Sequence, residues 1–242
     1  MNAVLLAAGL GSRLGSLTKD LPKALISVGG KPLLLHALRF AGLLEPTRIV
    51  VVGGFGFSLV KEALAQHRGT LPVELVENTR FRDGNLVSLL TARPLLTEGF
   101  LVMNVDHIYR QTIANVVRPD VERVTAFIDT DRKLGEDDMK VERGSDGRVV
   151  VIAKTLTTFD CGYVGMTRVP TELLGRYWEE AERALVEEGR AIHVERILAR
   201  LAKTADAPAC RDISGHGWLE VDTPDERAAA ERALMADGWS ER

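Results

Sequence analysis

Short apolar runs recur along the first half of the chain, and segments with mixed polar and apolar positions separate them. Four such runs predict buried strands, at residues 3–7, 48–52, 73–77 and 100–104. Leucine, valine and alanine recur at helical spacing in the segments between them, which predicts helices at residues 32–41, 57–67 and 85–95. Strands that alternate with helices are typical of an α/β fold built on a mainly parallel sheet.

The second half of the chain continues this alternation and adds a hairpin. A glycine-bearing turn at residues 144–147 predicts a hairpin between strands at 140–143 and 148–152. Further strands are predicted at residues 123–129 and 218–221, and residues 158–166 are predicted to form a turn that leads into a strand. Further helices are predicted at residues 108–117, 171–188, 192–203 and 224–236. The charged segment 130–138 lies between two of these elements and predicts a solvated loop or a lid.

The first predicted strand ends in a loop that contains Gly9, Gly11, Ser12 and Arg13, and Lys23 follows ten residues after the arginine. Glycines let a backbone turn tightly and bring its N–H groups close to phosphate oxygens. The arginine and the lysine add the positive charge that a triphosphate needs. We therefore interpret this stretch as a triphosphate-binding loop.

Other glycine loops fit less well. A dinucleotide-binding loop requires G-x-G-x-x-G at the start of a helix, but Leu14 occupies the third glycine position and Pro22 prevents a long helix. A Walker loop requires G-x-x-x-x-G-K-[ST], and the sequence contains no such run. On the glycines alone, a plain strand–turn connection remains open. The second glycine cluster, residues 53–56, lacks arginine and lysine, and we interpret it as a crossover turn.

A polar loop containing Gly84 leads into the helix that is predicted to begin at Asn85. Asn85 suits a helix N-cap, and its carboxamide together with free backbone N–H groups could instead hold a base or ribose. Asp106 follows the strand predicted at 100–104, at the edge of the sheet where ligands gather in open α/β folds. We expect Asp106 to bind Mg²⁺, which prefers carboxylate oxygens, although an acid that only caps the next helix is the alternative.

Three residues of the second half are candidates for binding a second substrate. Lys154 directly follows the hairpin and is either a surface lysine or a contact for a phosphate. Lys140 is a weaker candidate for the same role, and Asp160 could accept hydrogen bonds from hydroxyl groups.

Composition narrows the class of protein without identifying its substrate. The net charge is −3, which does not suggest a nucleic-acid surface. No apolar run reaches the ~20 residues of a membrane span. Because the first predicted strand follows Met1 and Asn2 directly, we expect no signal peptide. Cys161 and Cys210 lie far apart and outside any C-x-x-C motif, which fits a reducing cytoplasm.

Several stretches together resemble the sugar-phosphate nucleotidyltransferases. The opening L-A-A-G-x-G-[ST]-R-L and the following L-P-K-x-L are similar to the signature of that superfamily. Asn78, Phe81, Asn85 and Ser88 fall in a pattern similar to that of phosphocholine and inositol-phosphate cytidylyltransferases. Late in the chain, W-x-x-[VI]-D-T ends at Thr223 and resembles the end of the catalytic domain in this family. Taken together, the chain is most similar to the inositol-1-phosphate cytidylyltransferases.

This resemblance implies a single Rossmann-like, GT-A-type three-layer α/β domain over residues 1–242. Its nucleotide-binding half would cover residues 1–118, and its acceptor-binding half, with the hairpin, residues 119–242. It implies that Arg13 and Lys23 are catalytic and face the triphosphate, while Asp222 joins Asp106 as the second ligand of Mg²⁺. The implied nucleotide-binding residues are Leu6, Ala7, Ala8, Gly9, Gly11, Ser12, Arg13, Lys23, Asn78, Gly84, Asn85, Ser88 and Asp106. Lys154, Asp160 and Lys140 would bind the acceptor.

The implied reaction transfers CMP from CTP to a phosphorylated alcohol, inositol 1-phosphate, in a cytoplasmic enzyme that could form a homodimer. Asn104 stands where the family often has glycine, and residues 162–164 replace a more polar stretch, which leaves the acceptor open. Phosphocholine, an aminoalkylphosphonate or a sugar 1-phosphate are the alternatives. A nucleotide-binding subunit without catalysis and a dinucleotide-dependent oxidoreductase are rivals of other classes.

Overall fold

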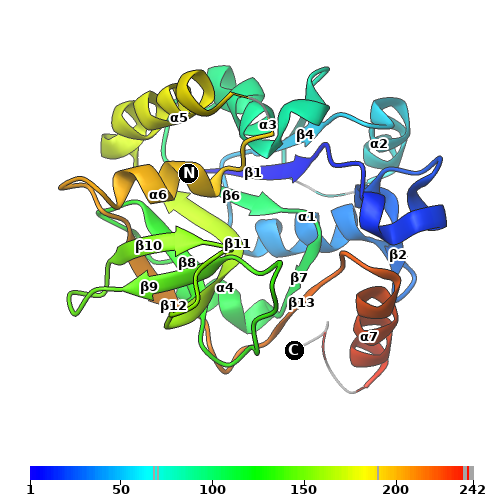
Figure 1. Ribbon diagram of the computed structural model, residues 1–242. Coiled ribbons are helices and arrows are strands. Elements are labelled where there is room, and N and C mark those ends of the chain that lie inside the picture. Colours follow the sequence, from blue (N-terminus) through cyan, green and yellow to red (C-terminus); the bar gives the residue numbers. More distant parts are fainter. Residues whose placement is uncertain (68, 70, 190, 237–238, 240–242) are drawn as a thin grey trace.

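Four parallel strands form the centre of the fold (Figure 1). The structure is a computed structural model that describes residues 1–67, 69, 71–189, 191–236 and 239. These strands lie in the order β6 (Phe100–Asn104), β1 (Asn2–Ala7), β4 (Ile49–Gly53) and β5 (Val73–Glu77). Leu5 of β1, for example, pairs with Val51 of β4 on one side and Met103 of β6 on the other. The two inner strands are almost wholly buried, as expected for a sheet covered on both faces.

Antiparallel strands extend this sheet beyond β6. β11 (Cys161–Val169) pairs with β6, with β8 (Thr125–Asp129) and with β9 (Lys140–Arg143). β9 forms the predicted hairpin with β10 (Val149–Ala153). A strand that the sequence pattern does not predict, β12 (Ala209–Asp212), pairs in parallel with β8. β2 (Ser27–Val28) and β3 (Lys31–Pro32) form a separate short pair.

Helices cover both faces of the sheet (Figure 1). One face packs against α3 (Asn85–Ala92), α5 (Leu174–Glu188) and α6 (Glu195–Leu201). The other packs against α1 (Leu33–Leu43), α2 (Phe57–Ala65) and α4 (Ala114–Val117). The predicted α/β class and three-layer arrangement are confirmed. α7 (Pro224–Met235) packs against the loop after β1 and against β2.

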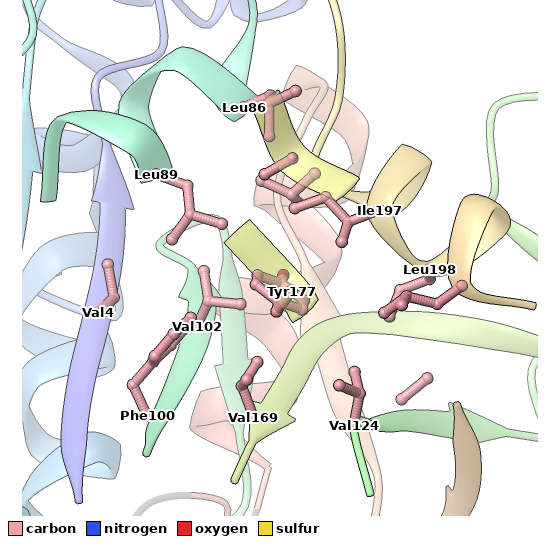
Figure 2. Packing of buried hydrophobic residues seen from close by; sticks show 14 of the residues in the cluster. Val4, Leu86, Leu89, Phe100, Val102, Val124, Val169, Tyr177, Ile197 and Leu198 are labelled. Atoms are coloured by element: carbon pink, nitrogen blue, oxygen red, sulfur yellow. The ribbon is translucent and has the colours of Figure 1, made fainter. Parts of the chain in front are cut away.

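Side chains from several elements fill the core on the α3–α5–α6 face. Figure 2 shows Val4 and Val102 of the sheet, Leu89 of α3, Tyr177 of α5 and Ile197 of α6 converging there. Phe100 stacks on Trp178 with ring centroids 5.3 Å apart. This packing holds the central strands in place, and with them the loops at their carboxyl ends.

The helix predicted at residues 108–117 is wrong in its first part. Residues His107–Tyr109 form strand β7, which pairs with β13 (Trp218–Glu220), and helical turns begin only at Gln111. The buried Tyr109 hydroxyl donates a hydrogen bond of 2.6 Å to the carbonyl of Val164. Long-range pairing thus outweighs a local helical pattern.

Other predicted elements differ mainly at their ends. α3 ends at Ala92, and the remaining predicted residues, Arg93–Leu95, form a 3-10 turn that contains Pro94. Helix α6 is shorter than the predicted 192–203, and β11 continues beyond the predicted 166 to Val169. The division at residue 118 stays a prediction, and residues 237, 238 and 240–242 of the expected domain lie outside the described residues.

Both cysteines are free, and their surroundings make their thiols weak nucleophiles. Burial raises the pKa of Cys161 to about 11 and that of Cys210 to about 12. Because the thiolate is the reactive form, we expect alkylation by iodoacetamide at pH 8 to be at least ~100-fold slower than that of free cysteine. Mass spectrometry measures this rate, and unfolding in urea should restore it. Fast labelling of the folded protein would contradict the raised pKa of these thiols.

Candidate active site

A cavity of about 670 Å³ opens at the carboxyl ends of β1 and β6. The loop after β1 forms one wall, from Ala8 to Arg13, and the start of α3 forms another. Residues 137–139 and the segment before α6 also line the cavity. In an open α/β sheet this edge is where ligands bind. Within the described residues, no helix has both the length and the apolar character needed to cross a bilayer.

The loop after β1 is fixed by its own backbone contacts. Gly11 has a φ of 66°, and a Cβ atom there would lie 2.8 Å from Cβ of Lys23. The carbonyl of Gly11 accepts hydrogen bonds from the Leu14 amide and, at 2.8 Å, from the Thr18 hydroxyl. A side chain at position 11 would therefore strain the backbone and displace the lysine. The loop presents Gly9, Gly11 and Ser12 to the cavity as the sequence predicts.

Two cations and two carboxylates meet on the floor of this cavity. The Nζ of Lys23 lies 2.7 Å from Oδ2 of Asp106 and donates a second hydrogen bond to Asp222. The Arg13 guanidinium pairs with the other carboxylate oxygen of Asp222 and lies 3.3 Å from Asp137. All four predicted residues are thus brought together, although Asp106 and Asp222 are far apart in the sequence.

Local pairing explains how the two carboxylates meet. Asp106 directly precedes β7 and Asp222 lies two residues after β13, and these strands pair with Ile108 opposite Leu219. The Val221 amide donates a hydrogen bond of 3.0 Å to the Asp106 carbonyl. The same two-stranded ladder therefore sets the backbone of both acids.

The start of α7 holds Asp222 from the other side. The Glu226 carboxylate accepts hydrogen bonds from the amides of Asp222 and Thr223, at 2.8 and 2.9 Å. In return the Thr223 hydroxyl accepts from the Glu226 amide, which completes a capping box. Thr223 is thus a helix cap in the structure, and the capping box also holds the backbone of Asp222, the residue just before it.

We expect Thr223→Ala to lower the free energy of unfolding by about 1 kcal/mol, because the cap hydrogen bond is lost. Urea unfolding followed by circular dichroism measures this change. Thr223→Ser keeps the hydroxyl and is the matched control. If Thr223→Ala matches the stability of the wild type, the hydroxyl does not stabilise α7.

Electrostatics keep this cluster charged. Burial alone would lower the pKa of Lys23, but Asp106 and Asp222 more than offset it, so the pKa lies above its usual value. Burial alone would raise the pKa of Asp106, yet Lys23 and His107 hold it well below its usual range. The cluster therefore presents an ionised carboxylate and an ammonium group at neutral pH.

His107 packs beneath Asp106, as a neighbour that shapes the site. Its Nδ1 lies 2.7 Å from Oδ1 of Asp106, and its Nε2 lies 3.8 Å from Glu220. The ring stacks on Tyr109 and packs against Trp218, with centroids 5.8 and 5.1 Å away. The pKa of His107 is raised, because the carboxylates of Asp106 and Glu220 outweigh the effect of burial.

The polar stretch before α3 supports the cavity mainly through internal hydrogen bonds. The Asn78 carboxamide donates 2.9 Å to the Ser88 hydroxyl and accepts from the Arg80 amide. Asn85 is the first residue of α3, with Gly84 at the cap position, and its side chain accepts from the Val194 amide at 2.8 Å. Asn85 is therefore not an N-cap by its side chain. Gly84, Asn85 and Ser88 line the cavity, whereas Asn78 lies outside its lining.

The structure separates the remaining predicted residues. Leu6, Ala8 and Lys154 line the cavity, but Ala7 is buried in the core beneath it. The Lys140 ammonium donates to three backbone carbonyls, at 2.8 to 3.4 Å, and is not part of the cavity lining. Asp160 also lies outside the lining, where it accepts from the Arg143 amide at 2.6 Å. The backbone thus already holds the side chains of Lys140 and Asp160.

Sequence reasoning did not name several polar residues of the lining as site residues, among them Arg82, His193, Glu195 and Glu220. Arg82 lies in the polar stretch before α3, where its side chain stacks over Phe81, 4.9 Å from the ring centroid. His193 and Glu195 follow α5 in a segment without a recognisable motif. Only their approach to β10 and β11 in the fold reveals them.

The chemistry of Asp106 and Asp222 fits Mg²⁺. Within the part of the chain that the structure describes, no three histidine, cysteine or acidic side chains are grouped to hold a metal on their own. Mg²⁺ is commonly held by only one or two carboxylates, with substrate phosphates and water as further ligands. The two aspartates, which now share the Lys23 ammonium, match that requirement.

Comparison with known proteins agrees with this geometry. The sequence profile of the MobA-like NTP transferase domain matches residues 3–136. A "Bifunctional IPC transferase and DIPP synthase" from Rubrobacter xylanophilus is 34% identical over 247 residues, covering 99% of this chain and 53% of the relative. The chain spans about half the length of such bifunctional relatives.

A second relative is similar along its whole length. The "UTP--glucose-1-phosphate uridylyltransferase AglF" of Haloferax volcanii is 37% identical over 259 residues, covering 98% of both chains. Among solved structures, the inositol-1-phosphate CTP transferase from T. maritima superposes with a TM-score of 0.82 at 20% identity, covering 99% of this chain and 97% of that one. This chain belongs to the MobA-like NTP transferase family.

Proposed function

We propose that this protein transfers CMP from CTP to a phosphorylated alcohol, inositol 1-phosphate, and releases pyrophosphate. The observation that carries the proposal is the cluster of Arg13, Lys23, Asp106 and Asp222 beside a glycine loop at the carboxyl edge of the sheet. The choice of base and acceptor follows the relatives named for inositol-1-phosphate CTP transfer and for IPC transfer.

In the proposed reaction, an oxygen of the acceptor's phosphate attacks the α-phosphorus of CTP. The bond to the bridging oxygen breaks, and pyrophosphate leaves with the electron pair. Such a transfer depends on positioning and charge stabilisation rather than on a covalent enzyme intermediate. The loop from Gly9 to Ser12 would hold the phosphates through its backbone N–H groups.

The charged side chains would bind different parts of the substrates and the metal. Arg13 would bind the β- and γ-phosphates, and Lys23 the α-phosphate or the attacking phosphate, so both would exchange their carboxylate partners for substrate. Asp106 and Asp222 would hold Mg²⁺, which when bound supplies neutralisation of phosphate charge. Lys154, which also lines the cavity, would contact the acceptor's phosphate.

A second candidate rests on the full-length relative. Because AglF is named for UTP and glucose 1-phosphate, uridylyl transfer to a sugar 1-phosphate is the alternative that a specific observation favours. The catalytic cluster would act identically in both reactions, since the base and the acceptor lie beyond the reacting phosphates.

Pyrophosphate release tests both candidates directly. Four nucleoside triphosphates are combined with Mg²⁺ and with inositol 1-phosphate, phosphocholine, aminoethylphosphonate, glycerol 3-phosphate or glucose 1-phosphate. We expect release with CTP and inositol 1-phosphate. Release only with UTP and glucose 1-phosphate would replace the first candidate by the second. Binding of nucleotide without release from any pair would contradict both.

A further inference from the structure

A buried carboxylate in the cavity wall has no partner from another residue. Glu195 begins α6, is only 8% exposed and lines the cavity. Its carboxylate accepts a hydrogen bond from its own backbone amide, and no other group among the described residues donates one to it. Glu180 of α5 shows the usual arrangement, because its buried carboxylate lies 2.9 Å from Arg200 and 3.1 Å from Arg176.

The position of Glu195 is unfavourable for an isolated charge. Burial raises its pKa, since it disfavours the charged form, and the charge of Asp106 acts in the same direction, while the hydrogen bond from its own backbone, His193 and Lys154 act against it. One hydrogen bond leaves most of the acceptor capacity of a carboxylate unused, and unsatisfied buried acceptors cost free energy. Donors from a bound ligand would remove that cost, and the open side of Glu195 is the cavity itself.

Glu195 is also close to the residue that is proposed to hold the acceptor's phosphate. The triphosphate is proposed to bind at the glycine loop and at the cluster of Asp106 with Lys23. Glu195 lines the same cavity as Lys154, which directly follows the hairpin and whose charge acts on the Glu195 carboxylate. A ligand whose phosphate reaches Lys154 therefore brings its remaining groups close to Glu195.

We propose that Glu195 selects a polyhydroxylated acceptor by accepting hydrogen bonds from its hydroxyl groups. This inference rests on the proposed nucleotidyl transfer and assigns to the same cavity the residue that recognises the acceptor. Neutral hydroxyl donors suit this position, because Lys154 already supplies positive charge to that stretch of the wall.

A quaternary ammonium group fits the site less well. Such a group binds best between aromatic faces. Besides two imidazoles, the aromatic rings that line the cavity in the described part of the chain are those of Phe81 and Tyr163. The Arg82 guanidinium already stacks on Phe81, and the Tyr163 hydroxyl is hydrogen-bonded to Thr167 at 2.8 Å. The lining therefore offers no cage for choline.

The test compares wild type, Glu195→Gln and Glu195→Ala with CTP and two acceptors, inositol 1-phosphate and an analogue that lacks ring hydroxyls. We expect Glu195→Ala to raise the KM for inositol 1-phosphate by about 10- to 100-fold, the effect of losing hydrogen bonds to a charged group. Glu195→Gln should have a smaller effect. In both variants, the KM for CTP should stay within twofold of the wild-type value, and the melting temperature within a few degrees of it. Glu172→Gln, which changes an exposed acid, is the control.

The second measurement is equilibrium dialysis of inositol 1-phosphate without turnover. Loss of binding in Glu195→Ala supports the inference even if wild type releases no pyrophosphate, a result that would contradict only the proposed function. If wild type turns over inositol 1-phosphate and the variants keep its KM, the inference about Glu195 fails while the proposed function stands. Three other results would also overturn the inference about Glu195. The first is an equal loss of affinity for the analogue without ring hydroxyls. The others are a wild type that does not bind inositol 1-phosphate, and a wild type that turns over phosphocholine alone.

Discussion

Replacing Asp106 by asparagine should reduce nucleotidyl transfer by about 10³-fold or more while leaving the fold intact. The proposal assigns Asp106 to Mg²⁺, and loss of one charged ligand removes charge stabilisation that matters most in the transition state. The fold should survive, because Lys23 keeps its second ion pair with Asp222. Pyrophosphate release at saturating CTP and Mg²⁺ measures the effect, and circular dichroism checks the fold.

Asp20→Asn provides the control for this variant. Asp20 is an exposed acid near the same loop, so its replacement makes the same change in net charge outside the cavity. We expect activity within twofold of wild type. Near-normal turnover by Asp106→Asn would mean that Asp106 does not hold the metal, and the carboxylate pair would lose its assigned role.

Replacing Lys23 by methionine should lower turnover by about 10²- to 10³-fold, the loss expected when one donor to a developing negative charge is removed. Methionine keeps much of the buried aliphatic stem but leaves Asp106 and Asp222 without the ammonium between them. Two carboxylates without that cation should bind a divalent ion more tightly. We therefore expect Mg²⁺ alone to raise the melting temperature more in the variant than in wild type.

Lys19→Met is the matched control, since Lys19 is exposed on the same segment of the chain. It should change neither the rate nor the response of the melting temperature to Mg²⁺. If Lys23→Met keeps more than a tenth of the wild-type rate, Lys23 does not contact the reacting phosphates. If Mg²⁺ does not change the melting temperature of Lys23→Met, the two carboxylates do not form a metal site in the free protein.

Much of the fold could be predicted because its central strands and covering helices have strong local patterns. β1 and β4 are continuous apolar runs, so their burial follows from composition alone. β7 and β12 are exceptions, because they are three and four residues long and depend on partners distant in the sequence. The local sequence around Ile108 predicts the start of a helix, but in the structure Ile108 pairs with Leu219 in a strand.

The candidate site divides in the same way. Arg13 and Lys23 could be predicted because glycines and cations lie close together in the sequence. Asp222 required a family resemblance, since spacing alone does not relate it to Asp106. Glu195 gave no signal, because an acid at the start of a helix is common and its burial appears only when α6 packs beside β10.

The pairing of β7 with β13 has a consequence for how the protein becomes active during folding. Joining Asp106 to Asp222 closes a loop of more than a hundred residues, and contacts of such sequence separation carry a large entropic cost before they form. The glycine loop and the strand pair β1–β4 are closer in sequence and need no such closure. We therefore expect the carboxylate pair to assemble late, so that a polypeptide emerging from the ribosome would have its proposed nucleotide loop long before its proposed metal site is complete.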